Sequence, residues 1–306
     1  MMLVDAPHGL LATYNHRALS HAPVFQDRMG DRVPHPYDLD FAAAREEYPF
    51  FGYVLAQNDG CDDFWMVSHD DDLVAQHYFW YGRNGYEPLS VKAWVERARS
   101  GTGAVLDVGA FSGVYSLLAY FANMANDVHL FEPTARAYAR SIDNCRVNLA
   151  SSRIVPHRLA LSDGPRRVEL NHFRGRQELG SGASYVVKSY ETTIHDVETC
   201  AASTLDEVCE DLLLRPRLVK IDVEEAEVDV LRGAERLIAA QTASFLIEVV
   251  AGTGEAVLDV MHHYDCHVVD EHNHQLVPVG RDRDQMMQLI ERNRFVNMLF
   301  DPTVHP

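Results

Sequence analysis

The chain has 306 residues and a formal net charge of −18, from 45 acidic and 27 basic side chains. It contains no long run of Lys and Arg, so we expect no nucleic-acid partner bound through a basic face. Hydrophobic residues make up 47% of the chain, enough for a sizeable core in one large domain or two modest ones. The five cysteines are scattered without a C-x-x-C pair, which argues against disulfides and a zinc site and indicates a reducing compartment.

Targeting and membrane signals are also missing from the sequence. The N-terminus lacks a basic segment followed by an apolar run, and no stretch of about 18 apolar residues occurs. We therefore expect a cytoplasmic protein with no membrane partner. The sequence leaves homo-oligomerisation open.

The first 77 residues form an N-terminal extension before the main domain, which we place at residues 78–306. The segment from residue 1 to about 35 is bounded and interrupted by prolines at positions 7, 23, 34 and 36, and we expect an irregular arm that packs on its own domain or on a partner subunit. Two apolar runs, at 50–55 and 64–67, predict a hairpin. The acids Asp70–Asp72 that follow are better explained as a solvated turn than as a metal site. Helical spacing resumes at Leu73.

The most informative stretch runs from Ala104 to Gly113. Residues 104–108 are apolar except for Asp107, which is typical of a buried parallel strand. Gly109 and Gly113 then bracket a tight turn. Apolar residues follow at helical spacing, namely Val114, Leu117, Leu118, Phe121 and Met124. In doubly wound α/β folds such a strand, glycine turn and helix hold a nucleotide-like ligand.

Two ligands compete for this turn. The dinucleotide fingerprint G-x-G-x-x-G would need glycine at Phe111 and Val114, so it fails twice. Asp107 would repel a pyrophosphate but suits the ammonium group of S-adenosylmethionine. The motif therefore favours S-adenosylmethionine over NAD, with an ordinary ligand-free turn as the alternative.

Two further strand ends carry polar groups. Residues 127–132 predict a second strand that ends in Glu132, an acid placed to accept both hydroxyls of a ribose. A third predicted strand, 154–161, ends in Ser162 and Asp163, which are placed to meet the adenine edge. Between these strands we expect a helix with one apolar face, made of Ala135, Tyr138, Ile142, Cys145 and Leu149.

Two stretches are candidates for covering the ligand or choosing the substrate. The aromatic stretch 80–88, with Tyr81 and Tyr86, either covers a bound ligand or simply packs. Residues 165–203 break the αβ rhythm. They contain a strand at 167–173 and then a loose polar segment, which we expect to face the substrate.

The second half returns to alternating strands and helices. Thr204 and Glu207 predict a capped helix, and Lys220 precedes a strand end at Asp222. Glu224, Glu225 and Glu227 are expected to open one helix that reaches Ile238, where acids suit the helix dipole. The remaining predicted elements are a strand at 244–250, helices at 254–264 and 281–293, a hairpin over 267–279 and a last strand at 295–300. We expect His272 and His274 to lie at the exposed tip of this hairpin and not to bind a metal.

In this order the motifs resemble those of the FkbM-type S-adenosylmethionine-dependent methyltransferases, over about residues 78–301. The matching segments are Tyr86–Pro88, Leu106–Gly113, Phe131–Pro133, Ala160–Asp163, Thr204–Asp206, Lys220–Ala234 and Asn297–Pro302. The resemblance implies an α/β class I methyltransferase fold, Rossmann-like, with a seven-stranded, mostly parallel sheet whose last strand is antiparallel. Two positions depart from the family: Glu225 stands where Gly is usual, and Phe111 where Asn is common.

The resemblance implies methylation of a hydroxyl oxygen on a small molecule such as a natural product or sugar, with S-adenosylmethionine as cofactor. The candidate cofactor-binding residues are Glu87, Asp107, Gly109, Ala110, Phe111, Gly113, Glu132, Pro133, Ser162, Asp163 and Asp222. Asp222, Glu224 and Glu225 are the candidate catalytic residues, with Glu224 as general base. We assign no metal, although Asp222 and Glu248 would be the ligands in a Mg²⁺-assisted variant. The alternatives are a non-catalytic nucleoside-binding module and an NAD-dependent oxidoreductase.

Overall fold

The computed structural model describes residues 9–30, 38–172, 179, 194, 196–293 and 295–303, and side chains from Thr13 onward. Most of the predicted substrate-facing segment after His172 lies outside these residues. Among the helices that are described, none has the length and apolar character needed to cross a bilayer.

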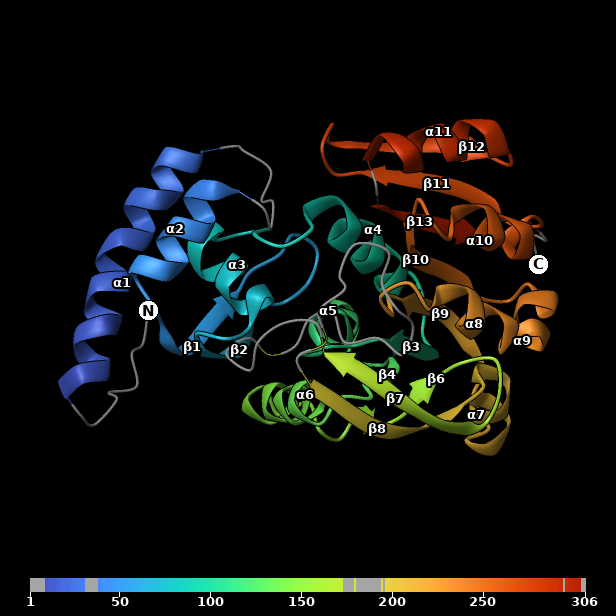
Figure 1. Ribbon diagram of the computed structural model, residues 1–306, viewed down its shortest axis with the longest axis horizontal. Helices are drawn as coiled ribbons and strands as arrows, with labels where there is room; N and C mark the ends of the chain where they lie inside the picture. Colours follow the sequence, from blue (N-terminus) through green and yellow to red (C-terminus); the bar gives the residue numbers. More distant parts are fainter. Residues whose placement is uncertain are drawn as a thin grey trace.

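A central sheet organises the main domain (Figure 1). Its order is β12-β11-β13-β10-β9-β3-β4-β5. The strands are β3 (Ala104–Val108), β4 (Asp127–Phe131), β5 (Ile154–His157), β9 (Pro216–Ile221), β10 (Ser244–Val250), β11 (Asp265–Asp270), β12 (Gln275–Gly280) and β13 (Phe295–Asp301). From β5 to β10 the neighbours pair in parallel, and β13 is antiparallel to β10 and β11. This confirms the α/β class I arrangement.

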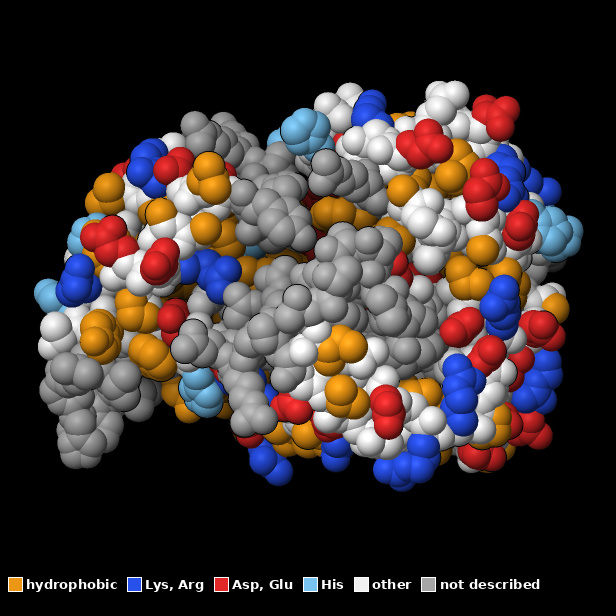
Figure 2. Space-filling model, in the orientation of Figure 1, with side chains coloured by type: hydrophobic (Ala, Val, Ile, Leu, Met, Phe, Trp, Pro, Cys, Tyr) orange, Lys and Arg blue, Asp and Glu red, His pale blue; other side chains and the backbone are white. Residues whose placement is uncertain are grey.

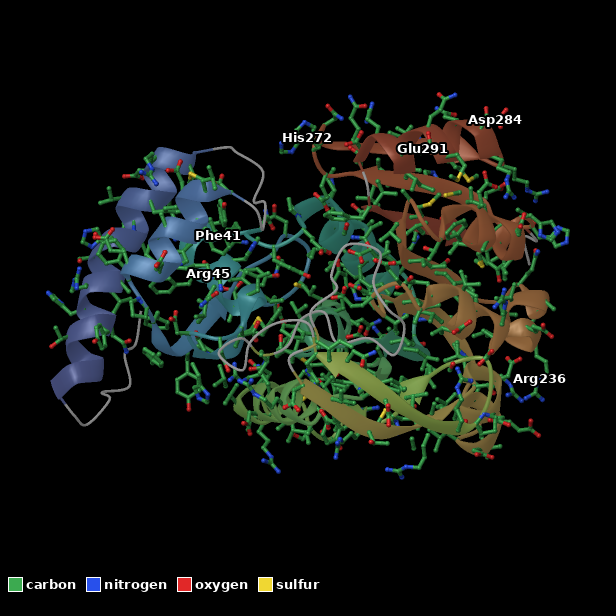
Figure 3. All side chains as sticks on the ribbon, in the orientation of Figure 1. Phe41, Arg45, Arg236, His272, Asp284 and Glu291 are labelled. Carbon is green, nitrogen blue, oxygen red and sulfur yellow. The ribbon has the colours of Figure 1, made fainter. Side chains whose placement is uncertain are left out.

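The sheet has eight strands and not the seven expected. The extra strand is β12, which pairs with β11 as the second arm of the predicted hairpin and lies at the sheet edge. The hairpin tip is exposed at His272 and His274, as predicted, and Figure 3 shows His272 pointing outward from it.

Helices cover both faces of the sheet because successive strand residues point to opposite sides. They are α4 (Pro88–Arg99), α5 (Val114–Ala122), α6 (Ala135–Val147), α7 (Leu205–Asp211), α8 (Glu227–Arg232), α9 (Glu235–Ala240), α10 (Gly254–Met261) and α11 (Arg283–Asn293). On β3, Val105 joins a core with α4 and α5, whereas Leu106 joins a second core with α8, α9 and α10. The capping box on α7 is present as predicted.

The predicted single helix from Glu224 to Ile238 is wrong at its start and in its middle. Helix α8 begins at Glu227, and the chain breaks at Gly233 before α9. A Cβ on Gly233 would lie 2.0 Å from the carbonyl oxygen of Ser162, so the absent side chain lets that segment approach. Helix α5 likewise ends at Ala122, which leaves Met124 exposed and outside the apolar face predicted for it.

In the residues that the structure describes, the N-terminal extension is mainly helical, so the expectation of an irregular arm is wrong there. Its elements are α1 (Gly9–Met29), α2 (Leu39–Glu47), β1 (Phe51–Ala56), β2 (Phe64–His69) and α3 (Leu73–Tyr81), which crosses the boundary set at residue 77. Ala18, Ala22, Phe25 and Met29 form one buried face of α1, at spacings of three and four. The predicted arm thus packs on its own chain, against α3, at the left of Figure 1.

The hairpin β1–β2 is confirmed, and helix α6 completes its outer edge with polar side chains. Asn148 and Asn144 accept hydrogen bonds at 2.7 Å from the backbone N–H groups of Trp65 and Val67. Helix α6 therefore buries a partly polar face. The apolar face predicted for it is confirmed at Cys145, which is buried, and wrong at Ala135 and Leu149, which are exposed. The other buried residues of the helix are Ala137, Arg140, Ser141 and Asn144.

The acids after β2 do not form a solvated turn. Asp72 is fully buried, caps the N-terminus of α3 and lies near Arg140, which is itself buried. Arg140 also pairs with the largely buried Asp71 at 3.0 Å. These acids are buried because a guanidinium and helix N–H groups compensate their charge.

The predicted third strand is split between two sheets. Its first half, β5, belongs to the central sheet and ends at His157. The second half, β6 (Ala160–Leu161), pairs with β8 (Asp196–Ser203), which also pairs with β7 (Arg166–His172). The strand predicted at 167–173 is confirmed as β7.

Candidate functional site

The turn after β3 is tightly constrained. Gly109, Phe111 and Gly113 have φ angles of 78°, 51° and 84°, in the left-handed region. A Cβ on Gly109 would lie 1.7 Å from the carbonyl oxygen of Asp222, so only glycine allows this approach. The amide groups of Gly109 and Ala110 both donate to the carbonyl of Phe131, at 2.9 and 3.0 Å. The turn is therefore held against the ends of both β9 and β4.

Carboxylates from separate parts of the chain surround a buried lysine beside this turn. Lys220 on β9 is 2% exposed, and its Nζ donates to Asp222 at 2.6 Å. The Nζ also lies 4.4 Å from the centre of the Tyr115 ring. Tyr115 donates a hydrogen bond to Glu87 at 2.5 Å, and Asp107 accepts one from Ser116 at 2.7 Å.

The charges in this cluster shift one another. Burial raises the pKa of Glu87 and of Asp107, and the Lys220 ammonium opposes both shifts. Burial by itself would lower the pKa of Lys220, but Asp222, Glu87 and Asp107 outweigh it and raise that pKa. Lys220 therefore stays charged, and its ammonium group compensates part of the negative charge of the surrounding carboxylates.

Glu132 links the end of β4 to the glycine turn. It is 6% exposed and accepts hydrogen bonds from the backbone N–H of Phe111 at 2.9 Å and from Thr134 at 2.8 Å (N–H) and 2.6 Å (hydroxyl). Burial raises the pKa of Glu132 to about 7, against the effect of these donors. Pro133 lies between Glu132 and Thr134, the N-cap residue of α6.

Asp163 is not brought to the end of a central strand. It follows β6 in the smaller sheet, is exposed, and forms an ion pair with Arg166, whose hydrogen bond lowers its pKa. Ser162 is buried, and its hydroxyl accepts a hydrogen bond from Arg166 at 2.7 Å. Both residues therefore follow a strand of the smaller sheet and not a strand of the central sheet.

Glu224 and Glu225 follow Asp222 and precede helix α8. The prediction that they lie in the first turn of that helix is therefore wrong. Their φ angles are 59° and 75°. The left-handed angle at Glu225 explains why glycine is suited to this position. The first residue of α8, Glu227, accepts hydrogen bonds from the N–H groups of Val223 at 3.1 Å and Glu225 at 3.2 Å.

Glu248 on β10 completes the acidic group. Burial raises its pKa well above the usual range, and the charges of Asp222, Glu224, Glu87 and Glu227 add to this effect. Across the described residues, no set of three or more His, Cys, Asp or Glu side chains is arranged to hold a metal ion.

The sequence interpretation missed four of these residues: Lys220, Tyr115, Glu227 and, except as a metal ligand, Glu248. One signal was available for Lys220, because a residue two positions before Asp222 on a strand points to the same side. Tyr115 gave no such signal, since its contact with Glu87 depends on the packing of α5 against α4. Tyr86 and Tyr81 pack against aromatic neighbours, Tyr86 beside His77 and Tyr81 beside Phe25.

Comparison with known families decides the family question. A model described as a methyltransferase FkbM domain matches residues 107–293, more than half of the chain. The chain belongs to the FkbM methyltransferase family. The matched region contains the glycine turn, Glu132 and the segment from Lys220 to Glu227, which belong to the candidate site.

Individual relatives of this FkbM domain are distant. The AMB antimetabolite synthetase AmbE of Pseudomonas aeruginosa is 24% identical over 301 residues, covering 83% of this chain and 13% of AmbE. A methyltransferase FkbM from Methylobacillus flagellatus is 12% identical with a TM-score of 0.42, covering 94% of this chain and 60% of that one. A SAM-dependent methyltransferase from Agrobacterium tumefaciens is 8% identical with a TM-score of 0.42, covering 82% and 71%. The chain thus spans only part of the first two relatives.

Proposed function

We propose that this chain binds S-adenosylmethionine at the glycine turn and transfers its methyl group to a hydroxyl oxygen of a small molecule. The observation that carries the proposal is the set of carboxylates at neighbouring strand ends. Asp107 lies at the end of β3, Glu132 follows β4 and Asp222 follows β9. In open α/β sheets, ligands bind at the carboxyl ends of the strands.

The residues fit this cofactor chemically. One ammonium group, that of Lys220, faces three carboxylates, those of Glu87, Asp107 and Asp222. An excess of buried negative charge is costly unless a cation compensates it. S-adenosylmethionine brings an ammonium and a sulfonium group, whereas the pyrophosphate of NAD would add repulsion. The donor set therefore supports the sulfonium cofactor over a dinucleotide.

We assign the site by position along the strand ends. Asp107 and the turn from Gly109 to Gly113, with Ala110, would receive the methionine end, and Glu87 would close that side. Glu132 would accept the ribose hydroxyls, while Phe111 and Pro133 flank it. Ser162 and Asp163 remain our candidates for the adenine edge.

The chemistry requires alignment and removal of one proton. When bound, S-adenosylmethionine supplies an activated methyl group, so a C–S bond breaks as the new O–C bond forms. Glu224 would accept the proton of the attacking hydroxyl on its carboxylate. Asp222, fixed by Lys220, would hold the geometry between cofactor and acceptor. Glu225 borders the acceptor side in this scheme.

Calorimetric titration tests the cofactor. S-adenosylmethionine, S-adenosylhomocysteine and NAD are titrated into the wild type, Glu132→Ala and the exposed control Glu291→Ala, which Figure 3 places on α11. We expect both sulfur compounds to bind to the wild type and the control, and binding to be lost in Glu132→Ala. Binding of NAD without the sulfur compounds would contradict the proposal.

Turnover tests the base. S-adenosylhomocysteine release is followed with a panel of hydroxylated small molecules. Removing a general base typically lowers turnover about 10²–10⁴-fold. We expect a loss in this range for Glu224→Gln, with unchanged affinity for S-adenosylhomocysteine. Unchanged turnover would remove Glu224 as the base.

A further inference from the structure

The loop between β9 and α8 holds two consecutive non-glycine residues in the left-handed region. These are Glu224 at φ 59° and Glu225 at φ 75°. L-residues seldom adopt this conformation, and the surrounding structure must stabilise it where they do. Glu224 is the residue that we assign as base, so whatever stabilises this loop also sets the direction of that side chain.

Glu227 contacts this loop from within the chain. Its Oε1 accepts hydrogen bonds from the N–H groups of Val223 and Glu225, which lie on either side of Glu224. The side chain is 1% exposed, and its backbone belongs to the first turn of α8. A rigid helix residue therefore holds both ends of the three-residue loop 223–225.

Among the described residues, the second carboxyl oxygen of Glu227, Oε2, makes no hydrogen bond that would give this side chain another role. Oε2 is buried and has no hydrogen-bond partner in the part of the chain that the structure describes. Burial raises the pKa of Glu227 to about 8, and the charges of Asp222 and Glu224 add to this shift. The neutral acid still offers Oε1 as an acceptor. Holding the loop thus needs an acceptor oxygen and not a negative charge.

We propose that Glu227 is a positioning residue of the methyl-transfer site, whose Oε1 holds residues 223–225 so that Glu224 faces the acceptor hydroxyl. This inference rests on the proposed function. Glu227 is too deeply buried to touch the acceptor, so its effect passes through Glu224. The same contact compensates for the glutamate that stands at position 225 in place of the family glycine.

Three variants separate this role from others. Glu227→Gln keeps an acceptor oxygen at the same place, Glu227→Ala removes it, and Glu225→Gly removes the strain that the acceptor opposes. We expect Glu227→Ala to lower kcat at least tenfold, with KM and the Kd of S-adenosylhomocysteine within threefold of wild type. Glu227→Gln should stay within threefold of wild type in all three quantities. In the Glu225→Gly background, the loss caused by Glu227→Ala should be several-fold smaller.

A second measurement does not depend on turnover. Amide hydrogen exchange at Val223 and Glu225 should be at least tenfold faster in Glu227→Ala and unchanged in Glu227→Gln. If no hydroxyl acceptor is turned over by the wild type, the proposed function fails while this exchange pattern still tests the contact. Equal damage by Gln and Ala, or unchanged exchange in Glu227→Ala, would overturn the positioning role.

Discussion

Substituting Gly109 by alanine is the sharpest test of how the site is assembled. The added Cβ would lie 1.7 Å from the carbonyl oxygen of Asp222, about half of an ordinary contact distance. The N–H of Asp222 donates to Val108 at 3.0 Å, so moving that residue also strains the β3–β9 pairing. The substitution therefore acts on two strand ends at once.

The magnitude follows from two contributions. A non-glycine residue in the left-handed region costs about 1–2 kcal/mol. Forcing a methyl group into closely packed backbone costs about 1–3 kcal/mol more. We expect Gly109→Ala to lower the free energy of unfolding by about 2–5 kcal/mol and to abolish binding of S-adenosylhomocysteine, because the carboxylates of Asp107 and Asp222 move apart.

Two matched glycine variants serve as controls, with urea unfolding and calorimetry as assays. Gly113 also has a positive φ of 84°, but its nearest neighbour, Ser141 Cβ, is 3.3 Å away, so Gly113→Ala should cost about 1–2 kcal/mol. Gly164 has no atom within 4 Å of an added Cβ, so Gly164→Ala should change stability by less than about 0.5 kcal/mol. Equal losses at positions 109 and 113 would refute the close approach to Asp222.

Three other predictions concern Glu132 and Glu87 in the candidate site and Glu271 at the N-terminus of α4. In our scheme the ionised form of Glu132 accepts the ribose hydroxyls, and the pKa of Glu132 is raised to about 7. Protonation below about pH 7 should therefore lower the affinity for S-adenosylhomocysteine by up to tenfold per pH unit. A Kd that stays constant from about pH 5.5 to 8 by calorimetry would contradict this. Tyr115→Phe removes one hydrogen-bond donor to the half-buried Glu87 carboxylate and should cost about 1–3 kcal/mol in urea unfolding. An unchanged midpoint would show that the contact is dispensable. Glu271 accepts from two N–H groups in the first turn of α4, so Glu271→Ala should cost about 0.5–2 kcal/mol, and no loss would mean that water replaces the cap.

The surface agrees with the charge balance read from the sequence. On the face shown in Figure 2, Lys and Arg side chains lie interspersed with Asp and Glu. Arg236 illustrates this on α9, where it pairs with Glu210 and Asp206. On this face the acids that give the net charge of −18 therefore lie among basic side chains.

Much of the main domain was determined by the sequence itself. Short apolar runs, glycine positions and caps are local signals, so β3 was predicted at its observed bounds and the α7 cap at Thr204. The strand ends with Asp107, Glu132 and Asp222 follow from the same logic, because parallel strands bring their carboxyl ends to one edge. The site residues predicted from the sequence are therefore those that lie at this edge of the sheet.

Tertiary structure decided what local patterns do not encode. Polar side chains of α6, such as Asn144, are buried because they satisfy the edge of a distant strand, which rotates the buried face away from the one that periodicity predicts. Glu224 and Glu225 read as helix-opening acids, yet the hydrogen bonds from their loop to Glu227 hold them in left-handed conformations. Lys220 stays charged in a buried place because three carboxylates from separate elements surround it. Hydrogen bonding and charge compensation in the folded chain determined these features, and among them the spacing gave a signal for Lys220 alone, through its place two residues before Asp222.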